Sequence, residues 1–504
     1  MRRLPLLVTG ATGHVGHAVV RALAARRPLV LLVRPGRDEG ARERVARLFP
    51  GDGEASPRVR AALAAGDVEV VEGDVSEPGL GLVAAARARL AATLGGIVHL
   101  AARTDFASGD AADYRPANVD GTRHVAELAL AAGCPLVHAS THAVAGDRAG
   151  TIAEDDLDVG QGFHNGYERS KLEAEVLLRG LGAERGLAAA CLRLGIVLPD
   201  APVDGIPTGS GPLVYLEHLA RLEGDGRSGG VREVRIEGDP QAHLHLTPIP
   251  FVVRALVASL DRCDRAVPTY HVTPARPFPL ARVVAAGNAV VRGLRVAIAP
   301  EGEPFAPDRF EAALARRCRA YRPYHFLRAT CDRRRFAADL GPAAGPDGAD
   351  DAWLGRVFAA HLERFRARGR GAAAPPAGPH ADVARYFARF LADKTGRRLV
   401  PGLETLTADF TVSVPVAGRF RIAVDGGRLV RAGPAPAPGP ARAFDYEIDG
   451  DGFLDVVAGR TRPADLFFAG RVRIRGDLFA ALATATALGD FFRLHPYASS
   501  EPRA

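Results

Sequence analysis

Tyr167 and Lys171 are the two residues whose types and spacing most clearly suggest chemistry. They stand four positions apart, so in a helix both side chains lie on one face and the ammonium can approach the phenol. Lys171 is one of only two lysines among the 65 basic residues, and a compact ammonium suits a site beside a ring and an oxyanion better than a planar guanidinium does. Lowering a phenol pKa from about 10 to near 7 requires about 4 kcal/mol of phenolate stabilisation. We therefore expect Lys171 to activate Tyr167, which in a reduction donates a proton to a carbonyl oxygen as hydride arrives.

This spacing also occurs by chance, so the prediction depends on the elements that would position the pair. Near the start of the chain an apolar run, residues 6–8, leads directly into glycines at positions 10, 13 and 16, and a helical pattern follows. Glycines there permit a tight turn and a close approach of backbone to a pyrophosphate, while the helix N-terminus supplies N–H donors. The arrangement predicts a dinucleotide site. Its expected cofactor-binding residues are Thr9, Gly10, Thr12, Gly13, His14, Val15 and Gly16.

The end of the second predicted strand, residues 29–33, indicates which nucleotide binds. A carboxylate about 20 residues past the glycines would accept hydrogen bonds from the ribose hydroxyls of NAD. This chain has Arg34 and Arg37 there instead. A guanidinium cannot accept from a hydroxyl, but its forked donors can bind a 2′-phosphate. We expect NADP(H) to be preferred over NAD(H), the alternative being that these arginines belong to a solvated turn.

Further apolar runs follow at the spacing of strand–helix–strand units. They cover residues 68–71, 96–100, 136–139 and 192–197. Strands that alternate with helices predict an α/β fold, a doubly wound parallel-sheet Rossmann domain carrying a small substrate cap. Ligands bind at the carboxyl ends of such strands. The residues expected to complete the cofactor site there are Asp74, Val75, Ala101 and Ala102, together with Lys171.

Several of these motifs follow one another in the order of a known superfamily. They are Thr9 to Gly16, Gly73-Asp74-Val75, His99-Leu100-Ala101-Ala102, Asn118-Val119-Asp120-Gly121-Thr122, Ser140-Thr141 and the Tyr167–Lys171 pair. Over residues 4–275 the chain thereby resembles the extended short-chain dehydrogenase/reductases. The segments Leu31 to Arg34, Gly73 to Pro78, Ala101 to Phe106 and His138 to Thr141 are similar to the fatty acyl-CoA reductase, or male sterility, branch and to related thioester reductase domains.

The resemblance implies roles for individual residues. Thr141 would hydrogen-bond the substrate oxygen and stabilise its developing charge, with Ser140 as the neighbouring alternative. Asn118 would help to position Lys171, directly or through water. The implied substrate is a long-chain acyl thioester or another apolar lipid. One departure bears on substrate identity: where the family commonly has Arg-Pro-x-x-Val, this chain has Arg193-Leu194-Gly195-Ile196-Val197.

Residues 200–365 are expected to cap the site. His243 and His245 alternate as on a strand, and without a third ligand they indicate a strand face, so no metal is expected. Residues 316–335 hold eight arginines and a single acid. Such a stretch is either a solvated helical surface or a patch that attracts CoA phosphates or an acidic acyl carrier protein.

A second module follows a segment whose composition is that of a linker, residues 366–380. Beyond it, residues 381–504 predict an α+β domain. The residues that carry a resemblance here are Phe444 to Ile448, Phe453 to Arg460, Pro463 and Phe468 to Asp477. They resemble the sterol carrier protein type 2 domain, which implies an apolar tunnel for acyl chains or sterols. The alternative is an ordinary packed core. The residues expected to line either one are Leu478, Phe479, Leu482, Leu488, Phe491 and Phe492.

Bulk composition narrows the functional class. A chain of 504 residues should form two or three domains. The formal charge of +7 comes without aromatic–basic interleaving, so no nucleic-acid partner is expected. Five cysteines without Cys-x-x-Cys spacing indicate reduced thiols. The first apolar run is too short for a signal peptide or a membrane span, so we expect a cytoplasmic protein without stable membrane insertion.

Three functional hypotheses remain at this point. The first is NADPH-dependent reduction of a fatty acyl thioester to an aldehyde or alcohol. The second is oxidoreduction of a sterol-type hydroxyl or ketone, since the same Tyr–Lys chemistry and the same lipid module would serve it. The third is a lipid-binding or transfer protein whose reductase half only senses nucleotide. The Tyr167, Lys171 and Thr141 set argues against the third, because only catalysis needs all three.

Overall fold

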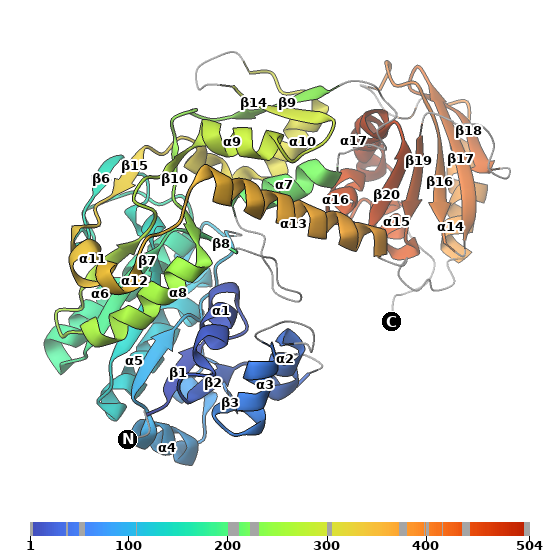
Figure 1. Ribbon diagram of the computed structural model, residues 1–504. Coiled ribbons are helices and arrows are strands. Elements are labelled where there is room, and N and C mark those ends of the chain that lie inside the picture. Colours follow the sequence, from blue (N-terminus) through green and yellow to red (C-terminus); the bar gives the residue numbers. More distant parts are fainter. Residues whose placement is uncertain are drawn as a thin grey trace. The chain divides into compact units, whose positions relative to one another are not determined.

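The computed structural model describes most of the chain (Figure 1). The described residues are 4–36, 39–49, 56–106, 108–199, 211–221, 231–299, 305–371, 381–397, 399, 403–415, 417–435 and 444–497. Contacts between Cα atoms divide the chain into two compact units. The first unit comprises residues 1–214, 237–286 and 320–361, and the second comprises residues 215–236, 287–319 and 362–504.

The first unit is built on a seven-stranded sheet in the order β12-β7-β5-β4-β1-β2-β3, and all of its paired strands are parallel. The strands are β1 (Leu6–Thr9), β2 (Leu29–Val33), β3 (Val68–Glu72), β4 (Gly96–His99), β5 (Leu136–Thr141), β7 (Ala189–Leu194) and β12 (Thr269–Val272). Their sequences are almost continuously apolar because helices cover both faces of the sheet. The predicted parallel-sheet Rossmann fold is confirmed.

Alternate residues of each strand point to opposite faces. Leu6 and Val8 of β1 join one core cluster, together with residues of α1 (His14–Leu23) and α8 (Ile249–Ala258). Leu7 joins the other cluster, whose helical members come from α4 (Ala84–Thr93), α5 (Gly121–Ala132) and α6 (Gly166–Arg185). The sheet is therefore held between two helical layers, and the carboxyl ends of β1, β4 and β5 meet at one edge.

The segment predicted as a single strand over residues 192–197 is divided in two. β7 ends at Leu194, and β8 (Ile196–Leu198) pairs with β11 (Leu246–Pro248) outside the main sheet. Gly195 lies at the break. A Cβ atom there would stand 2.2 Å from the Thr247 hydroxyl and 2.3 Å from the His245 carbonyl oxygen. The glycine lets two segments approach closely, one position after Leu194, where the family pattern would place a proline.

The remaining elements belong to the first unit or are shared between the two units. They are α2 (Ala41–Leu48), α3 (Ser56–Ala64), η1 (Pro78–Gly81), η2 (Ala111–Asp113), η3 (Pro116–Asp120), η4 (His142–Ala145), β6 (Gly150–Ile152), α7 (Pro212–Arg221), β10 (His243–Leu244), η5 (Ser259–Arg262), β13 (Phe278–Pro279), α9 (Leu280–Asn288), η6 (Arg319–His325), β15 (Ala329–Cys331), α11 (Arg334–Asp339), α12 (Gly341–Ala344) and α13 (Asp351–Gly371). The end of α13, residues 366–371, belongs to the segment whose composition predicts a linker, and residues 372–380 lie outside the described ranges.

The second unit contains a five-stranded sheet in the order β18-β17-β16-β19-β20. Its strands are β16 (Ala408–Val414), β17 (Gly418–Asp425), β18 (Arg428–Pro434), β19 (Phe444–Ile448) and β20 (Val472–Gly476). β16 pairs in parallel with β19, and the other pairs are antiparallel. The helices beside them are α14 (Ala381–Arg385), η7 (Tyr386–Leu391), η8 (Ala392–Lys394), α15 (Gly450–Val457), α16 (Pro463–Phe468) and α17 (Leu478–Leu494). The same unit includes β9 (Arg232–Glu237), β14 (Leu294–Ala299) and α10 (Arg309–Arg317), with β9 paired to β14.

Candidate active site

The turn between β1 and α1 can be formed only by glycine at two of its positions. Gly10 has a φ of +68°, and a Cβ atom on it would stand 2.6 Å from the Ala101 backbone nitrogen. A Cβ atom on Gly16 would stand 2.0 Å from the Gly10 carbonyl oxygen, so α1 packs directly on the turn. The Gly13 N–H donates to the Gly10 carbonyl at 2.9 Å. The turn presents bare backbone at a helix N-terminus, which is the arrangement that fits the pyrophosphate of a dinucleotide.

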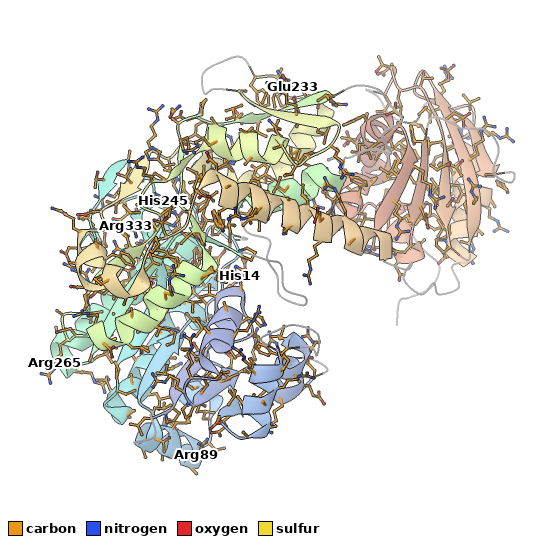
Figure 2. The ribbon with its side chains drawn as sticks, viewed as in Figure 1. His14, Arg89, Glu233, His245, Arg265 and Arg333 are labelled. Carbon is orange, nitrogen blue, oxygen red and sulfur yellow. The ribbon has the colours of Figure 1, made fainter. Side chains whose placement is uncertain are left out.

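Side chains beside this turn fix the ends of β1 and β4. The Thr9 hydroxyl accepts hydrogen bonds from the backbone N–H groups of Leu100 and Ala101, both at 3.2 Å, and lies 2.7 Å from His99 Nδ1. Ala102 follows in the same loop. Thr12 and Val15 lie on the two sides of Gly13, and His14 begins α1 (Figure 2). Burial lowers the pKa of His14 to about 4, so its imidazole is neutral at pH 7.

Arg34 and Asp74 meet where β2 and β3 end. Arg34 Nη1 lies 3.4 Å from Asp74 Oδ2, and the Arg34 side chain is 68% exposed. Burial acts to raise the pKa of Asp74, but hydrogen bonds from Ser76 and the charge of Arg34 outweigh it and lower that pKa. Val75 is buried against Gly121 at the start of α5. Arg37 lies outside the described residues.

Tyr167 lies in the first turn of α6, after the helix cap Asn165, whose side-chain oxygen accepts from the Glu168 N–H at 3.1 Å. The Tyr167 side chain is half-buried, and its phenol faces the Thr141 hydroxyl at the end of β5. Burial raises the pKa of Tyr167 to about 12, although the Thr141 hydrogen bond opposes that rise. The ring centroid of Phe106 lies 5.6 Å from that of Tyr167. The structure thus brings together the predicted phenol and hydroxyl.

Lys171 points to a different group from the one expected. Its Nζ lies 3.0 Å from His138 Nε2 and donates to the Ala139 carbonyl oxygen at 2.7 Å. Burial lowers the pKa of Lys171 to about 8, against the raising effect of the Glu175 charge. Burial dominates the pKa of Tyr167 and β5 holds the ammonium of Lys171, so the activation of Tyr167 by Lys171 stays a prediction.

Ser140 and Asn118 are buried and hydrogen-bond to groups other than the Tyr167 phenol. The Ser140 hydroxyl donates to Glu175 Oε1 at 2.5 Å, and Glu175 forms a buried ion pair with Arg193 at 2.8 Å. Asn118 donates to the Ser170 hydroxyl at 2.9 Å and accepts from the Arg103 N–H at 2.8 Å. Asn118 therefore fixes the loop after β4 to α6, and within the described part of the chain its hydrogen bonds go to Arg103 and Ser170 and not to Lys171.

The structure adds Tyr324 and Glu168, which were not selected from the sequence. The Tyr324 hydroxyl donates to Glu168 Oε1 at 2.5 Å and accepts from Asn165 Nδ2 at 2.8 Å. Its ring stacks on Phe106 with centroids 5.6 Å apart. The only sequence signal was the position of Glu168 directly after Tyr167. Phe106 thus contacts the rings of both Tyr167 and Tyr324, and the three rings form one aromatic cluster.

The arginine-rich stretch 316–335 is largely neutralised. Six of its eight arginines are in ion pairs: Arg317 with Asp465, Arg322 with Glu237, Arg328 with Asp239, Arg333 with Asp347, Arg334 with Asp332, and Arg335 with Asp155. Most of this charge is therefore used within the protein itself.

His243 and His245 both hydrogen-bond to the Ala329 carbonyl oxygen at 3.0 Å. These hydrogen bonds join the segment that contains β10 to β15. Within the described ranges, no group of three or more His, Cys, Asp or Glu side chains is placed to hold a metal ion. No helix in those same ranges combines the length and the apolar character that crossing a membrane requires.

Comparison with known proteins supports this description. Residues 8–256 match the family model of the male sterility protein. The isonitrile lipopeptide synthase of Mycobacterium tuberculosis (strain ATCC 25618 / H37Rv) is 32% identical over 294 residues, and the carboxylic acid reductase of the same strain is 30% identical over 284 residues. Each alignment covers 53% of this chain, but the chain spans only 11% and 24% of the two relatives' lengths.

A solved structure shows the same fold. The reductase domain of a nonribosomal peptide synthetase from Mycobacterium tuberculosis aligns with a TM-score of 0.54 and 26% identity. The alignment covers 72% of this chain and 93% of that domain. Together with the glycine turn and the Tyr167–Thr141 pair, these matches support an NAD(P)-dependent oxidoreductase domain of the extended short-chain dehydrogenase/reductase type, which is similar to male sterility proteins and to a peptide synthetase reductase domain.

Proposed function

We propose that this protein uses NADPH to reduce a long-chain acyl thioester to the aldehyde or the alcohol. The observation that supports the chemistry best is the approach of the Tyr167 phenol to the Thr141 hydroxyl at the carboxyl edge of the sheet. Two hydroxyl groups that meet beside a dinucleotide turn can both hydrogen-bond one carbonyl oxygen. The similarity to carboxylic acid reductase and to a peptide synthetase reductase domain favours an acyl thioester over a free ketone.

The roles of the individual residues are part of this proposal. Bound NADPH supplies the hydride. Tyr167 donates its proton to the carbonyl oxygen, and a phenol whose pKa is raised to about 12 is fully protonated at neutral pH, as a donor must be. Thr141 donates a hydrogen bond to the same oxygen and stabilises its developing charge. The tetrahedral product of the first reduction then loses its thiol, which carries away a proton, and leaves the aldehyde.

Lys171 is proposed to contribute a positive charge close to this group. His138 and the Ala139 carbonyl hold its ammonium at the end of β5, and its charge would favour negative charge on the reacting oxygens. Ser140 and Asn118 are proposed to act indirectly. Ser140 would fix Glu175 and β5, while Asn118 would fix α6 through Ser170.

The preference for NADPH is proposed from Arg34. Its guanidinium is exposed at the end of β2, where the 2′-phosphate of NADP would approach if the nucleotide lay over the glycine turn. The charge-assisted hydrogen bonds of arginine to a phosphate are stronger than neutral ones. The nearby Asp74 carboxylate keeps the Arg34 side chain oriented toward this edge.

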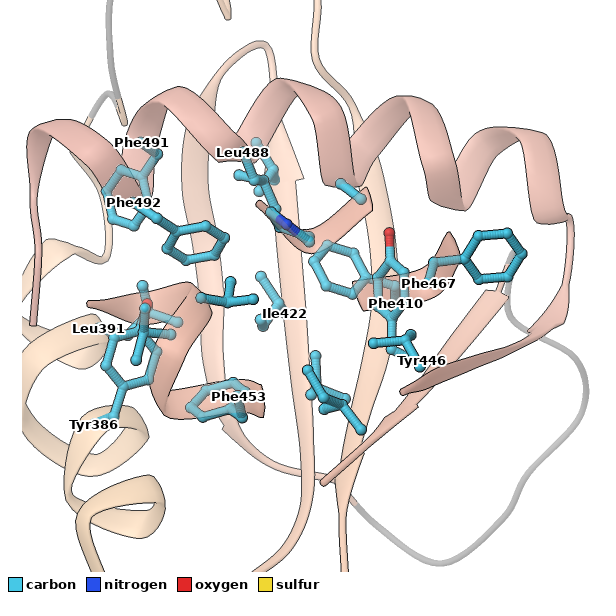
Figure 3. A pocket seen from close by; sticks show the side chains of 18 of the residues that line it. Tyr386, Leu391, Phe410, Ile422, Tyr446, Phe453, Phe467, Leu488, Phe491 and Phe492 are labelled. Atoms are coloured by element: carbon cyan, nitrogen blue, oxygen red, sulfur yellow. The ribbon is translucent and has the colours of Figure 1, made fainter. Parts of the chain in front are cut away.

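The second unit is proposed to bind the apolar part of a lipid, in a domain of the sterol carrier type. The sheet and α17 border an apolar pocket that is partly open to solvent (Figure 3). Four of the six residues expected to line it do so: Leu482, Leu488, Phe491 and Phe492. The aromatic ring of Phe479 instead lies under the Arg232 guanidinium, 3.9 Å from it. Either CoA or an acyl carrier protein is proposed to present the thioester.

A substrate comparison tests the proposed reaction. Purified protein with NADPH should convert palmitoyl-CoA, or palmitoyl groups on an acyl carrier protein, to hexadecanal or hexadecanol, detected by mass spectrometry. NADPH oxidation should match product in a ratio of one or two per thioester. A ketosteroid serves as the competing substrate. Turnover of the ketosteroid without turnover of either thioester would contradict the proposal.

A further inference from the structure

The pocket of the second unit is lined almost entirely by hydrocarbon. Its walls are aliphatic and aromatic side chains from the sheet, α15 and α17, among them Phe410, Ile422, Phe453 and Leu488 (Figure 3). None of the described residues that line it carries a charge, and only two of them, Tyr386 and Tyr446, have polar side-chain atoms. Any polar group that an occupant buries within this lining must therefore meet one of these two phenols or a backbone group.

The two phenols differ in what they bind. The Tyr446 hydroxyl donates to the Ala481 carbonyl oxygen of α17, so its donor is already used. The Tyr386 hydroxyl has no hydrogen-bond partner among the described residues, although the side chain is only 1% exposed. The rings of Phe387, Phe390, Phe453 and Tyr497 surround it, with centroids 5.3 to 5.4 Å away. Figure 3 shows Tyr386 and Tyr446 on different sides of the pocket.

An unsatisfied buried hydroxyl destabilises a protein by about 1–3 kcal/mol, and a hydrogen-bond acceptor brought to it would recover part of that free energy. A carboxylate or phosphate is a poor occupant, because no cation in the lining would compensate for its desolvation. Burial raises the pKa of Tyr386, so its phenol stays a neutral donor. The occupant should therefore be uncharged and should carry a hydrogen-bond acceptor. A long-chain lipid with one neutral oxygen has both properties.

We propose that this pocket binds a neutral long-chain lipid with a single oxygen, an alcohol or aldehyde, and that Tyr386 hydrogen-bonds that oxygen. The identity of the lipid rests on the proposed function: aldehydes and alcohols are what thioester reduction yields, whereas the thioester itself carries a charged carrier group. The second unit then retains the water-insoluble product of the reductase and does not primarily deliver its substrate.

Ligand binding to the full-length protein, without NADPH, tests the proposal. Hexadecanol, hexadecane, palmitate, palmitoyl-CoA and cholesterol, each delivered from cyclodextrin, compete with a fluorescent fatty probe. Hexadecanol should bind more tightly than palmitate and palmitoyl-CoA. Tyr386→Phe should weaken hexadecanol about three- to tenfold, the effect of one neutral hydrogen bond, and leave hexadecane unchanged.

Tyr446→Phe is the matched control, since it removes a phenol hydroxyl from the same lining. It should lower the unfolding temperature through loss of the bond to Ala481 and keep the preference for hexadecanol over hexadecane. Tyr386→Phe should leave the unfolding temperature unchanged or higher, because it removes an unsatisfied group, and this separates a binding defect from misfolding.

Three results would overturn the proposal. If Tyr386→Phe and the wild type bound hexadecanol with equal affinity, Tyr386 would not hydrogen-bond the oxygen of the lipid. If palmitate or palmitoyl-CoA bound more tightly than hexadecanol, the pocket would not prefer a neutral lipid. Tyr386-dependent binding of cholesterol alone would reassign the pocket to sterols. Because these assays need neither cofactor nor turnover, loss of the proposed reductase activity would not produce any of them.

Discussion

Around Tyr167 the first unit buries a dense set of polar and charged side chains, whereas the pocket of the second unit is lined by carbon. Glu175, Arg193 and Lys171 are at most 2% exposed, and all three hydrogen-bond to protein groups. In the pocket, one phenol is satisfied and the other is not. Groups that must hold a geometry are paired within the protein, while a group that awaits a ligand can remain unpaired.

The same distinction applies within the first unit. His138 contacts Lys171 through Nε2, but its Nδ1 has no hydrogen-bond partner among the described residues. Burial and the Lys171 charge lower the pKa of His138 well below its usual value, so the ring is neutral. A neutral imidazole can accept from the ammonium without repelling it. His138 therefore belongs with the groups that hold a geometry.

The largest expected effect concerns the phenol itself. Tyr167→Phe removes the proposed proton donor and should lower kcat/KM for the acyl thioester by about 10²- to 10⁴-fold, the range for general acid catalysis. NADPH oxidation at 340 nm measures it. Tyr270→Phe is the control, since that hydroxyl bonds Asp339 and takes no part in the site. Full turnover by Tyr167→Phe would contradict the proposed mechanism.

The second prediction contrasts buried and exposed charge. Glu175→Gln leaves the buried Arg193 without its counter-charge and should lower the free energy of unfolding of the first unit by about 3–5 kcal/mol. Asp490→Asn breaks a pair in the second unit whose side chains are 66% and 72% exposed, and should change stability by less than about 1 kcal/mol. Urea unfolding followed by circular dichroism compares them. Equal losses would mean that the Glu175 pair is not structurally important.

The third prediction concerns the cofactor. Arg34→Ala should raise KM for NADPH about tenfold and leave KM for NADH nearly unchanged, because only NADPH carries the 2′-phosphate. Arg89→Ala is the matched arginine control. Arg89 lies in α4 and forms an exposed ion pair with Glu69 of β3 (Figure 2). If Arg34→Ala weakened both nucleotides equally, the arginine would not discriminate between them.

The smallest effect is a pH dependence. Burial lowers the pKa of Lys171 to about 8, so the fraction of charged ammonium falls as the pH rises through that value. If the charge assists catalysis, kcat/KM should be highest below pH 8 and halve near it. A profile from pH 6 to pH 10 measures this, with stability checked at each pH. The residual activity of Lys171→Arg should be flat over the same range, because arginine keeps its charge.

Much of the fold could be predicted because it depends on local patterns. The strand from Leu29 to Val33 has the bounds that its apolar pattern indicates. β18 and α16 were not predicted. β18 lies at the edge of its sheet with several exposed residues, so it lacks a clear alternation. The division of β7 from β8 was also missed, since it depends on the contact of Gly195 with the distant residue Thr247.

The sequence by itself determined the parallel sheet, the glycine turn and the placement of Tyr167 and Thr141 at one edge, because strand order and helix periodicity carry that information. Only the tertiary structure decided which partner each polar side chain took. Lys171 bonds His138, 33 residues away, and Tyr324 bonds Glu168 across 156 residues. The Tyr386 hydroxyl has no hydrogen-bond partner among the described residues because apolar side chains surround it. Such pairings depend on side-chain direction and on contacts between distant segments, and no local pattern encodes either one.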